Sequence, residues 1–188
     1  MRLSWLPNAI TIVRMALAAP LAWLILRGHH APALALAVVA GLSDALDGVL
    51  AKGLGWQSRL GGILDPLADK LMLLACYLSL GVVDALPWWL VGLVLARDAI
   101  IVAGALAYHR LVGTLVAAPS LLSKATTVGQ IALVLLVLID ALHAVALPGW
   151  LQSGALLLVA VLTVASGLHY VVTWGAKARR EWKRGVAK

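Results

Sequence analysis

The sequence predicts an all-α integral membrane protein with six transmembrane helices. Of its 188 residues, 63% are hydrophobic and 12% are charged, whereas soluble domains contain about 25% charged residues. Apolar stretches of about 20 residues recur along the chain, each long enough to cross a hydrocarbon core of about 30 Å as a helix. A β-barrel is disfavoured, because polar and apolar residues do not alternate over segments of about 10 residues.

Turn-forming residues separate the apolar stretches and set the boundaries of each expected helix. The predicted spans are 8–27, 31–52, 60–82, 87–109, 119–141 and 148–175. The connections contain, in chain order, Gly28 to Pro32, Gly53 to Gly55, Asp84 with Pro87, Gly113 to Pro119, and Pro148 with Gly149.

Basic residues are predicted to lie almost entirely on one side of the membrane. With the N-terminus inside, 14 of the 15 Lys and Arg residues fall at inner ends, inner loops or the C-terminal tail, and only Arg27 falls outside. Basic residues resist translocation, so both termini are expected to be cytoplasmic. Tryptophans near predicted helix ends fit an interfacial belt. They are Trp23, Trp56, Trp88, Trp89, Trp150 and Trp174.

The whole chain, 1–188, is predicted to be a single membrane domain, because six spans leave no room for a second. Residues 1–6 precede the first span without a small-residue cleavage signal and are interpreted as an interfacial segment. Residues 176–188 form a basic cytoplasmic tail that suits an anionic membrane surface. Nucleic acid is not an expected partner, because the other basic residues are scattered along membrane helices.

Half of the eight acidic residues lie between positions 44 and 69. Asp44 and Asp47 are three residues apart, and Asp65 and Asp69 are four apart, so each pair lies on one face of its helix. The short connection, about residues 53–59, predicts antiparallel neighbouring helices. An ionised Asp at mid-bilayer costs about 2.5–3.5 kcal/mol, so the cluster needs a compensating charge or water. We expect the four carboxylates to converge on one polar pocket at the cytoplasmic side.

Divalent metal ions are the economical explanation of this cluster, since hard ions take carboxylate oxygens as ligands. There is no Cys and His ligand set for zinc, so Mg²⁺ or Mn²⁺ is expected, and four Asp suffice to bridge two ions. One carboxylate could remain free as a general base.

Small and phosphate-binding residues accompany the acids. Gly48, Ala51 and Gly61 let a bulky ligand approach the backbone, although glycine also serves helix packing in membranes. Two cations and a hydroxyl at the same level suit phosphate; they are Lys52, Arg59 and Ser58. The stretch predicts chemistry on a diphosphate whose lipid part stays in the bilayer.

The order of these residues is more specific than their chemistry. It is Asp44-x2-Asp47-Gly48-x2-Ala51-Lys52-x8-Gly61-x3-Asp65-x3-Asp69. This order resembles the signature of the CDP-alcohol phosphotransferase family, which carries Arg where this chain has Lys52. The segments PNAITIVR (residues 7–14) and KATTVGQ (residues 124–130) also resemble that family.

The resemblance implies roles for the signature residues. Asp44, Asp47 and Asp65 would hold metal, and Asp69 would complete the second metal site and act as base on the acceptor hydroxyl. The CDP moiety would lie against Asp47, Gly48, Ala51, Lys52, Ser58 and Gly61. Family members are usually homodimers that transfer a substituted phosphate from a CDP-linked donor to an alcohol and release CMP. An ammonium at Lys52 lacks the bidentate fork of Arg, which puts that phosphate contact in doubt.

The segment DPLADK (residues 65–70) resembles the branch that uses CDP-diacylglycerol and glycerol-headed acceptors in phospholipid biosynthesis. Phosphatidylglycerophosphate synthases of that branch typically show Arg-Glu and a second Arg eight residues after the first, which suits glycerol 3-phosphate. This chain has Arg97-Asp98 and an Ala at position 105. With Arg110 and the Ser123-Lys124-x2-Thr127-x2-Gln130 run, it looks more like the cardiolipin synthases, whose acceptor is phosphatidylglycerol. A bacterial cytoplasmic (inner) membrane is the expected location.

Arg97 and Lys124 lie within apolar spans, at a depth where a charge needs a partner. A phosphate is the natural partner, so together with Arg59 they are predicted acceptor or phosphate-binding residues; positive-inside anchoring is the alternative. Asp98 either belongs to the site or forms an ion pair with a neighbouring cation. Thr127 and Gln130 also suit hydrogen bonds between helices.

Two other classes of function compete with an enzyme. Acids in membrane helices also line ion or metal transport pathways, but a transporter would distribute polar groups through the membrane or show repeats around a midplane site. A noncatalytic relative would have no reason to keep four Asp residues. The sequence therefore favours a CDP-alcohol phosphatidyltransferase.

Overall fold

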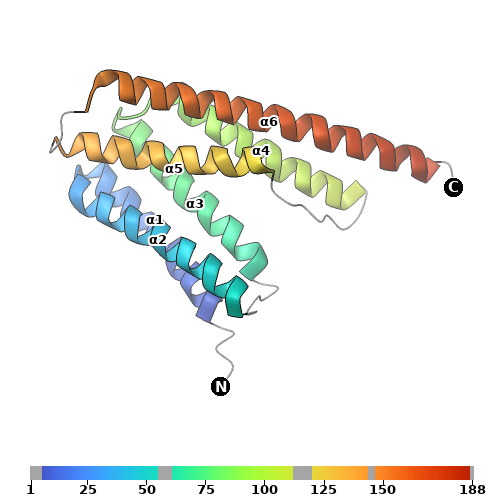
Figure 1. The fold of residues 1–188 in the computed structure, drawn as a ribbon, viewed down its shortest axis with the longest axis horizontal. Helices are drawn as coiled ribbons and strands as arrows, with labels where there is room; N and C mark the ends of the chain where they lie inside the picture. Colours follow the sequence, from blue (N-terminus) through green and yellow to red (C-terminus); the bar gives the residue numbers. More distant parts are fainter. Residues whose placement is uncertain (1–5, 55–60, 112–119, 144–146, 187–188) are drawn as a thin grey trace. The chain divides into compact units, whose positions relative to one another are not determined.

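The computed structural model of the chain describes residues 6–54, 61–111, 120–143 and 147–186. Within these helices, the side chains of residues 6–11, 44–54, 61–67, 69, 105–111 and 177–186 lie outside the described part. The described residues form six α-helices and their connections (Figure 1). The helices are α1 (Leu6–Leu26), α2 (His30–Leu54), α3 (Gly61–Val82), α4 (Trp88–Leu111), α5 (Leu121–Ala141) and α6 (Gly149–Val186).

The predicted all-helical class is confirmed, and eleven of the twelve predicted helix ends lie within two residues of the observed ends. The exception is α6, which continues to Val186 rather than ending at 175. Its last turns are rich in Ala, Lys, Arg and Glu, which favour helix independently of apolar character. The hydropathy pattern therefore marked where the apolar stretch ends and not where the helix ends.

Two helical stretches in the described part are long and apolar enough to cross a membrane. They are Leu121–Ala141, which is the whole of α5, and Gly149–Ala176 of α6. Shorter apolar stretches occur at Ile12–Leu26, His30–Ser43 and Lys70–Val82. Large apolar side chains such as Leu157 and Val172 are exposed on α6, as expected for a helix that faces lipid.

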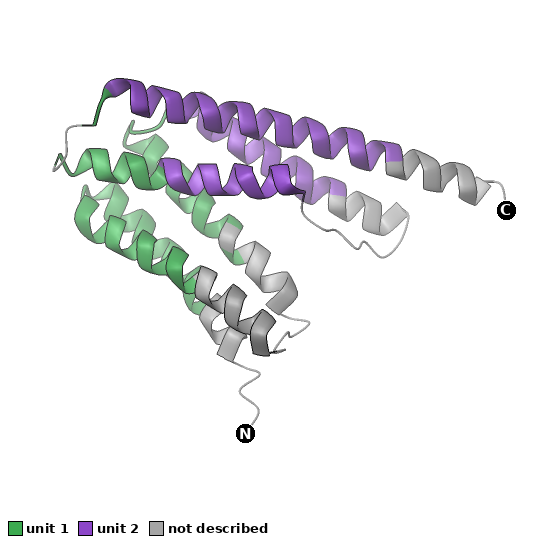
Figure 2. Cartoon of the chain, viewed as in Figure 1, with its two compact units in different colours: residues 1–87, 134–148 green, residues 88–133, 149–188 purple. Residues whose placement is uncertain are grey.

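The chain divides into two compact units, shown in different colours in Figure 2. The first, called unit 1, comprises residues 1–87 and 134–148, and the second, unit 2, comprises residues 88–133 and 149–188. In unit 1, α1 packs against both α2 and α3. In unit 2, α4 packs against α6. The helix that carries the first pair of signature acids and the helix that carries the second are thus both supported by α1.

Three helices end in residues with left-handed backbone conformation. Gly28 follows α1 with a φ of 72°, Asp84 follows α3 with a φ of 55°, and His143 follows α5 with a φ of 52°. After α1 the amide of Gly28 donates to Ile25 O at 3.0 Å and that of His29 to Leu24 O at 2.9 Å. The amides of Asp84 and Ala85 repeat this pattern after α3. These turns satisfy carbonyl groups that a helix end leaves without a partner.

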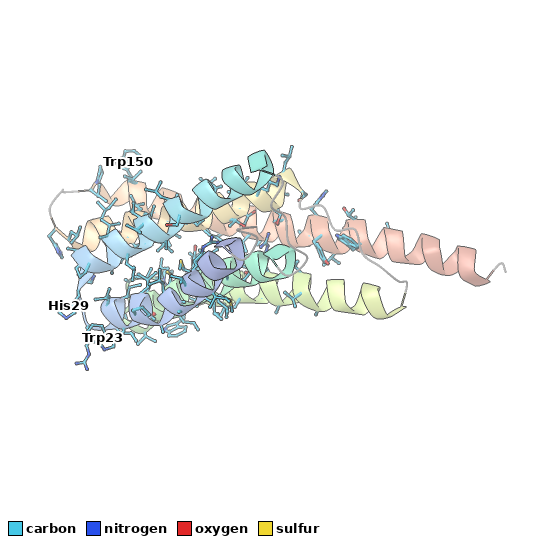
Figure 3. The ribbon with its side chains drawn as sticks, turned by 90° about the horizontal axis from the view of Figure 1, so that it is seen from below. Trp23, His29 and Trp150 are labelled. Atoms are coloured by element: carbon cyan, nitrogen blue, oxygen red, sulfur yellow. The ribbon has the colours of Figure 1, made fainter. Side chains whose placement is uncertain are left out.

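Trp23 anchors a small polar cluster at the end of α1. Its indole lies beside the His29 ring, with centroids 6.0 Å apart (Figure 3). The guanidinium carbon of Arg27 lies 5.8 Å from the centroid of the same indole, within the range of a cation–π interaction. An indole that carries polar groups at its rim and is 52% exposed suits the boundary between lipid and water.

Candidate functional site

The four signature acids lie on two helices of unit 1. Asp44 and Asp47 lie in α2, and Asp65 and Asp69 lie in α3. Because both segments are helical, each pair shares one face of its helix as the spacing predicts. The four side chains lie outside the described part, so their convergence on a common pocket stays a prediction.

The other predicted donor-binding positions fall in the same unit. Gly48, Ala51 and Lys52 follow the first acids in α2, and Gly61 begins α3. Their surroundings, and the whole of residues 55–60 with Ser58 and Arg59, are outside the described residues. Next to Asp69, the side chain of Ala68 is fully buried. At this level α3 is therefore packed into protein on one side.

The chemistry of the four acidic side chains indicates which metal ions they could bind. Four carboxylates at helical spacing of three and four offer oxygen ligands only, which suits Mg²⁺ or Mn²⁺ and not zinc. Elsewhere, among the residues whose side chains are described, no group of three His, Cys, Asp or Glu is placed to hold a metal ion.

A second polar cluster lies in unit 2, among residues whose side chains the structure describes. It is centred on Arg97 of α4, which is 5% exposed. Nη1 of Arg97 donates to Oδ1 of Asp98 at 2.6 Å. Nη2 donates to Oγ of Ser123 on α5 at 2.6 Å and to Oγ of Ser166 on α6 at 3.0 Å. Three helices therefore meet at one guanidinium, and we call these four residues the Arg97 cluster.

Local structure explains why Ser123 and Ser166 reach this point. Ser120 caps α5, since its Oγ accepts a hydrogen bond from the amide of Ser123 at 3.2 Å. On α6, the hydroxyl of Tyr170 donates to Ile101 O of α4 at 3.0 Å, about one turn from Ser166. The first turn of α5 and the register of α6 on α4 are both fixed by side chains.

The charges within the Arg97 cluster balance. Asp98 is 19% exposed and pairs with Arg97 through a short contact, so the ion-pair interpretation of Asp98 is confirmed. A simple surface anchor would extend Arg97 towards water, whereas the guanidinium is buried. In the described part of the chain, Nε of Arg97 is buried without a hydrogen-bond partner. Of the five N–H groups of Arg97, three donate to Asp98, Ser123 and Ser166, which leaves Nε–H and one N–H of Nη1 for a ligand.

Lys124 follows Ser123 on α5, and its side chain is exposed. Its predicted role towards phosphate stays a prediction. The neighbouring Thr127 donates to Ser123 O of its own helix at 3.2 Å. Gln130 Nε2 lies 3.5 Å from Oγ1 of Thr163 on α6. Of these two expected contacts between helices, Gln130 makes one and Thr127 bonds within α5.

Ser166 was missed in the sequence, although a signal for it existed. Thr163 and Ser166 stand three residues apart within an otherwise apolar stretch of α6, so they share a face. Both are buried, with 0% and 2% exposure. Polar side chains buried between membrane helices need partners. The missing information was the identity of the partner, which comes from α4.

Comparison with known proteins agrees with the residue order of the signature. The family model described as CDP-alcohol phosphatidyltransferase matches residues 4–174. A chloroplastic CDP-diacylglycerol–glycerol-3-phosphate 3-phosphatidyltransferase from Oryza sativa is 41% identical over 100 residues, which are 53% of this chain and 30% of that protein.

Two relatives named cardiolipin synthase (CMP-forming) show similar identity. The protein of Streptomyces coelicolor is 40% identical over 106 residues, 53% of this chain and 49% of the relative. The human protein is 38% identical over 99 residues, 52% of this chain and 33% of the relative. The matches therefore span half or less of the length of these relatives.

Proposed function

Because the chain belongs to the CDP-alcohol phosphatidyltransferase family, we propose that it transfers a phosphatidyl group from CDP-diacylglycerol to a glycerol-headed alcohol and releases CMP. The observation that carries this proposal is the family match over residues 4–174, which includes all four signature acids. The most favoured acceptor is phosphatidylglycerol, which would yield cardiolipin in phospholipid biosynthesis.

In the proposed reaction, a hydroxyl oxygen of the acceptor attacks the phosphorus that carries the diacylglycerol. Asp69 accepts the hydroxyl proton as general base. The bond from that phosphorus to the bridging oxygen of CMP breaks, and CMP leaves with the electron pair. The products are a new phosphodiester, CMP and the proton held by Asp69, so atoms and charges balance.

The signature residues divide the work of binding. Asp44, Asp47, Asp65 and Asp69 would hold two divalent ions, Mg²⁺ or Mn²⁺, which supply charge neutralisation for the diphosphate and the leaving phosphate. The CDP moiety is proposed to lie against Asp47, Gly48, Ala51, Lys52, Ser58 and Gly61. Arg59, Arg97 and Lys124 are proposed to bind the phosphate of the acceptor.

The Arg97 cluster supports phosphatidylglycerol over glycerol 3-phosphate. Phosphatidylglycerol carries one negative charge on a phosphodiester, whereas the phosphate monoester of glycerol 3-phosphate carries close to two at neutral pH. Asp98 pairs with Arg97 at 2.6 Å, so Arg97 offers less positive charge to a bound phosphate than an Arg without a carboxylate neighbour, which suits the singly charged phosphodiester. Glycerol 3-phosphate is the second candidate acceptor, because the name of the Oryza sativa relative includes it.

The proposed setting is a multi-pass protein of the bacterial cytoplasmic membrane. All six helices would span it with both termini cytoplasmic, and the protein would be a homodimer. The two stretches that are long and apolar enough to cross a membrane support the two C-terminal spans.

CMP release tests the proposal directly. Purified protein in detergent micelles receives CDP-diacylglycerol with Mg²⁺ or Mn²⁺, and phosphatidylglycerol and glycerol 3-phosphate are offered in separate reactions. Release with phosphatidylglycerol alone is expected. Release with glycerol 3-phosphate alone would show that glycerol 3-phosphate, and not phosphatidylglycerol, is the acceptor, and the protein would still be a transferase. No release with either acceptor would contradict the proposed enzyme activity. A transporter would need two compartments and would release no CMP here.

The Asp69→Asn variant tests the proposed base. Its kcat is expected to fall by about 10²- to 10⁴-fold, the usual contribution of a general base, while the fold and metal affinity are largely kept. Asp140→Asn, which removes an acid outside the signature from α5, serves as the control and should keep normal turnover. Appreciable activity of Asp69→Asn would assign the base to another residue.

A further inference from the structure

Ser166 contacts the guanidinium of Arg97 from a helix that carries no residue of the family signature. Its Oγ accepts a hydrogen bond from Nη2 of Arg97 at 3.0 Å, and its side chain is 2% exposed. Ser123 accepts from the same nitrogen at 2.6 Å. The two hydroxyl groups hold Nη2 between α5 and α6, while Asp98 holds Nη1 from the same helix as Arg97.

The stem of Arg97 also meets α6. A Cβ built at Gly167 would lie 3.7 Å from Cγ of Arg97, an ordinary van der Waals distance. Gly167 therefore leaves space beside the stem of Arg97, and the neighbouring Ser166 contacts its guanidinium. Asp98, the adjacent residue in the chain, can balance the charge of Arg97 but does not fix its direction relative to α5 and α6.

We propose that Ser166 is a positioning residue, which orients Arg97 so that its remaining N–H groups address the phosphate of the acceptor lipid. The proposal rests on the proposed function, because it assigns Ser166 to the acceptor side of that reaction. An Arg side chain has about 2 kcal/mol of rotamer entropy. Holding the guanidinium in its binding orientation before the acceptor arrives reduces the entropy lost on binding.

This role predicts a selective kinetic defect. In Ser166→Ala, the KM for the acceptor, expressed as its mole fraction in mixed micelles, is expected to rise about 3- to 10-fold, the range for one lost hydrogen bond. The KM for CDP-diacylglycerol should stay within about twofold, because the donor is proposed to lie in unit 1. Ser166→Thr keeps the hydroxyl and should restore the acceptor KM.

Thr163→Val provides the matched control. It removes another buried hydroxyl from the same face of α6, one turn away, and that hydroxyl bonds to Val159 O at 2.7 Å and receives a long contact from Gln130 at 3.5 Å. It makes no contact with Arg97 among the described hydrogen bonds. A merely structural role for Ser166 would give both variants the same defect. A rise in acceptor KM for Ser166→Ala alone supports positioning.

A double-mutant cycle separates action through Arg97 from any other effect. Arg97→Lys keeps a positive charge beside Asp98 but lacks the fork that reaches the two serines. In that background, Ser166→Ala is expected to leave the acceptor KM unchanged, because residues that act through one another are not additive. Equal effects of Ser166→Ala in both backgrounds would overturn the proposal.

Failure of the proposed function gives different results from failure of the Ser166 proposal. If the wild type uses glycerol 3-phosphate instead, the same cycle is measured with that acceptor and the same pattern is expected. If the wild type is inert, the rise in Tm caused by added phosphatidylglycerol is compared among the variants. A smaller rise for Ser166→Ala than for Thr163→Val supports positioning. Equal rises, or none in the wild type, would overturn it.

Discussion

The two units differ in what their interiors contain. In the described part of unit 1, large buried side chains are mostly apolar, such as Leu21, Ile25 and Leu80. Unit 2 also buries apolar residues, but it adds a series of polar ones between its helices. These are Arg97, Thr126, Gln130, Thr163 and Ser166. In the described part, unit 1 buries only Arg14 and Ser79 as polar residues, whereas the described bonds between side chains of different helices lie in unit 2.

The difference matters in a membrane, where burial in protein replaces lipid rather than water. Apolar packing has no directional bonds, so it specifies helix register through shape alone. Hydrogen bonds from Arg97 to Ser123 and Ser166 exist in one register only. We infer that unit 2 is built for a fixed geometry, which suits a proposed acceptor site with a single orienting cation.

The largest expected effect on stability lies in the interior of unit 1. Leu21 on α1 is fully buried, and Leu21→Ala would leave a cavity beside α2 or α3. We expect a loss of about 2 kcal/mol in the free energy of unfolding. This value is at the low end of the range for Leu→Ala in soluble proteins, because a side chain buried in a membrane protein is transferred from lipid and not from water.

Unfolding of Leu21→Ala by a denaturing detergent, followed by circular dichroism, measures this loss. The KM for both substrates should stay normal in the folded fraction. If Leu21→Ala is as stable as the wild type, the packing of the Leu21 side chain does not stabilise unit 1.

The close approach of α4 and α6 is the next test, and it lies in unit 2. A Cβ at Gly104 would lie 2.9 Å from Cε1 and 3.3 Å from the hydroxyl oxygen of Tyr170. Gly104→Ala is therefore expected to push the ring away from its bond to Ile101 O and to cost about 1–2 kcal/mol. Gly154→Ala on α6, which meets nothing within 4 Å, is the control.

Thermal unfolding of the two Gly→Ala variants in the same detergent checks this prediction. Gly154→Ala should equal or slightly exceed the wild type, because alanine favours helix over glycine. If Gly104→Ala behaves like Gly154→Ala, the packing of α4 on α6 is looser than the distances indicate.

The smallest expected effect is a gain at a helix end of unit 1. Asp84 has a φ of 55° after α3, a conformation that suits glycine and costs other residues about 1 kcal/mol. Asp84→Gly should therefore raise the free energy of unfolding by up to about 1 kcal/mol. Gly28→Ala, at a φ of 72°, is the converse variant and should lower it. Opposite shifts in Tm would confirm that these ends, and not only the core, contribute to unit 1.

Much of the fold could be predicted from the sequence because apolar runs and turn residues carry the helix boundaries. The direction in which each helix packs could not. Leu80 is buried and Leu121 is 84% exposed, yet both stand in apolar helices, since the outer surface of a membrane protein is as apolar as its interior. That α1 supports both α2 and α3 is therefore information that only the structure supplies.

The residues of the candidate site that are rare in apolar helices could be predicted from the sequence, and the common ones could not. Four Asp in fixed order within an apolar chain are conspicuous, and a buried Arg beside an Asp left two interpretations, of which the ion pair is confirmed. Ser166 is a small residue that membrane helices also use for packing. Its significance depends on a contact 69 positions away along the chain, which no local pattern encodes.

The hydrogen bonds of the two buried threonines bear on how α5 and α6 enter the membrane during synthesis. Thr126 donates to Leu122 O of its own helix at 2.8 Å, besides reaching Leu162 O at 3.1 Å, and Thr163 donates to Val159 O at 2.7 Å. Each hydroxyl thus has an acceptor within its own helix before the neighbouring helix has been made. The two helices can be inserted one after the other, and the bonds between them can form afterwards, when their side chains meet inside the bilayer.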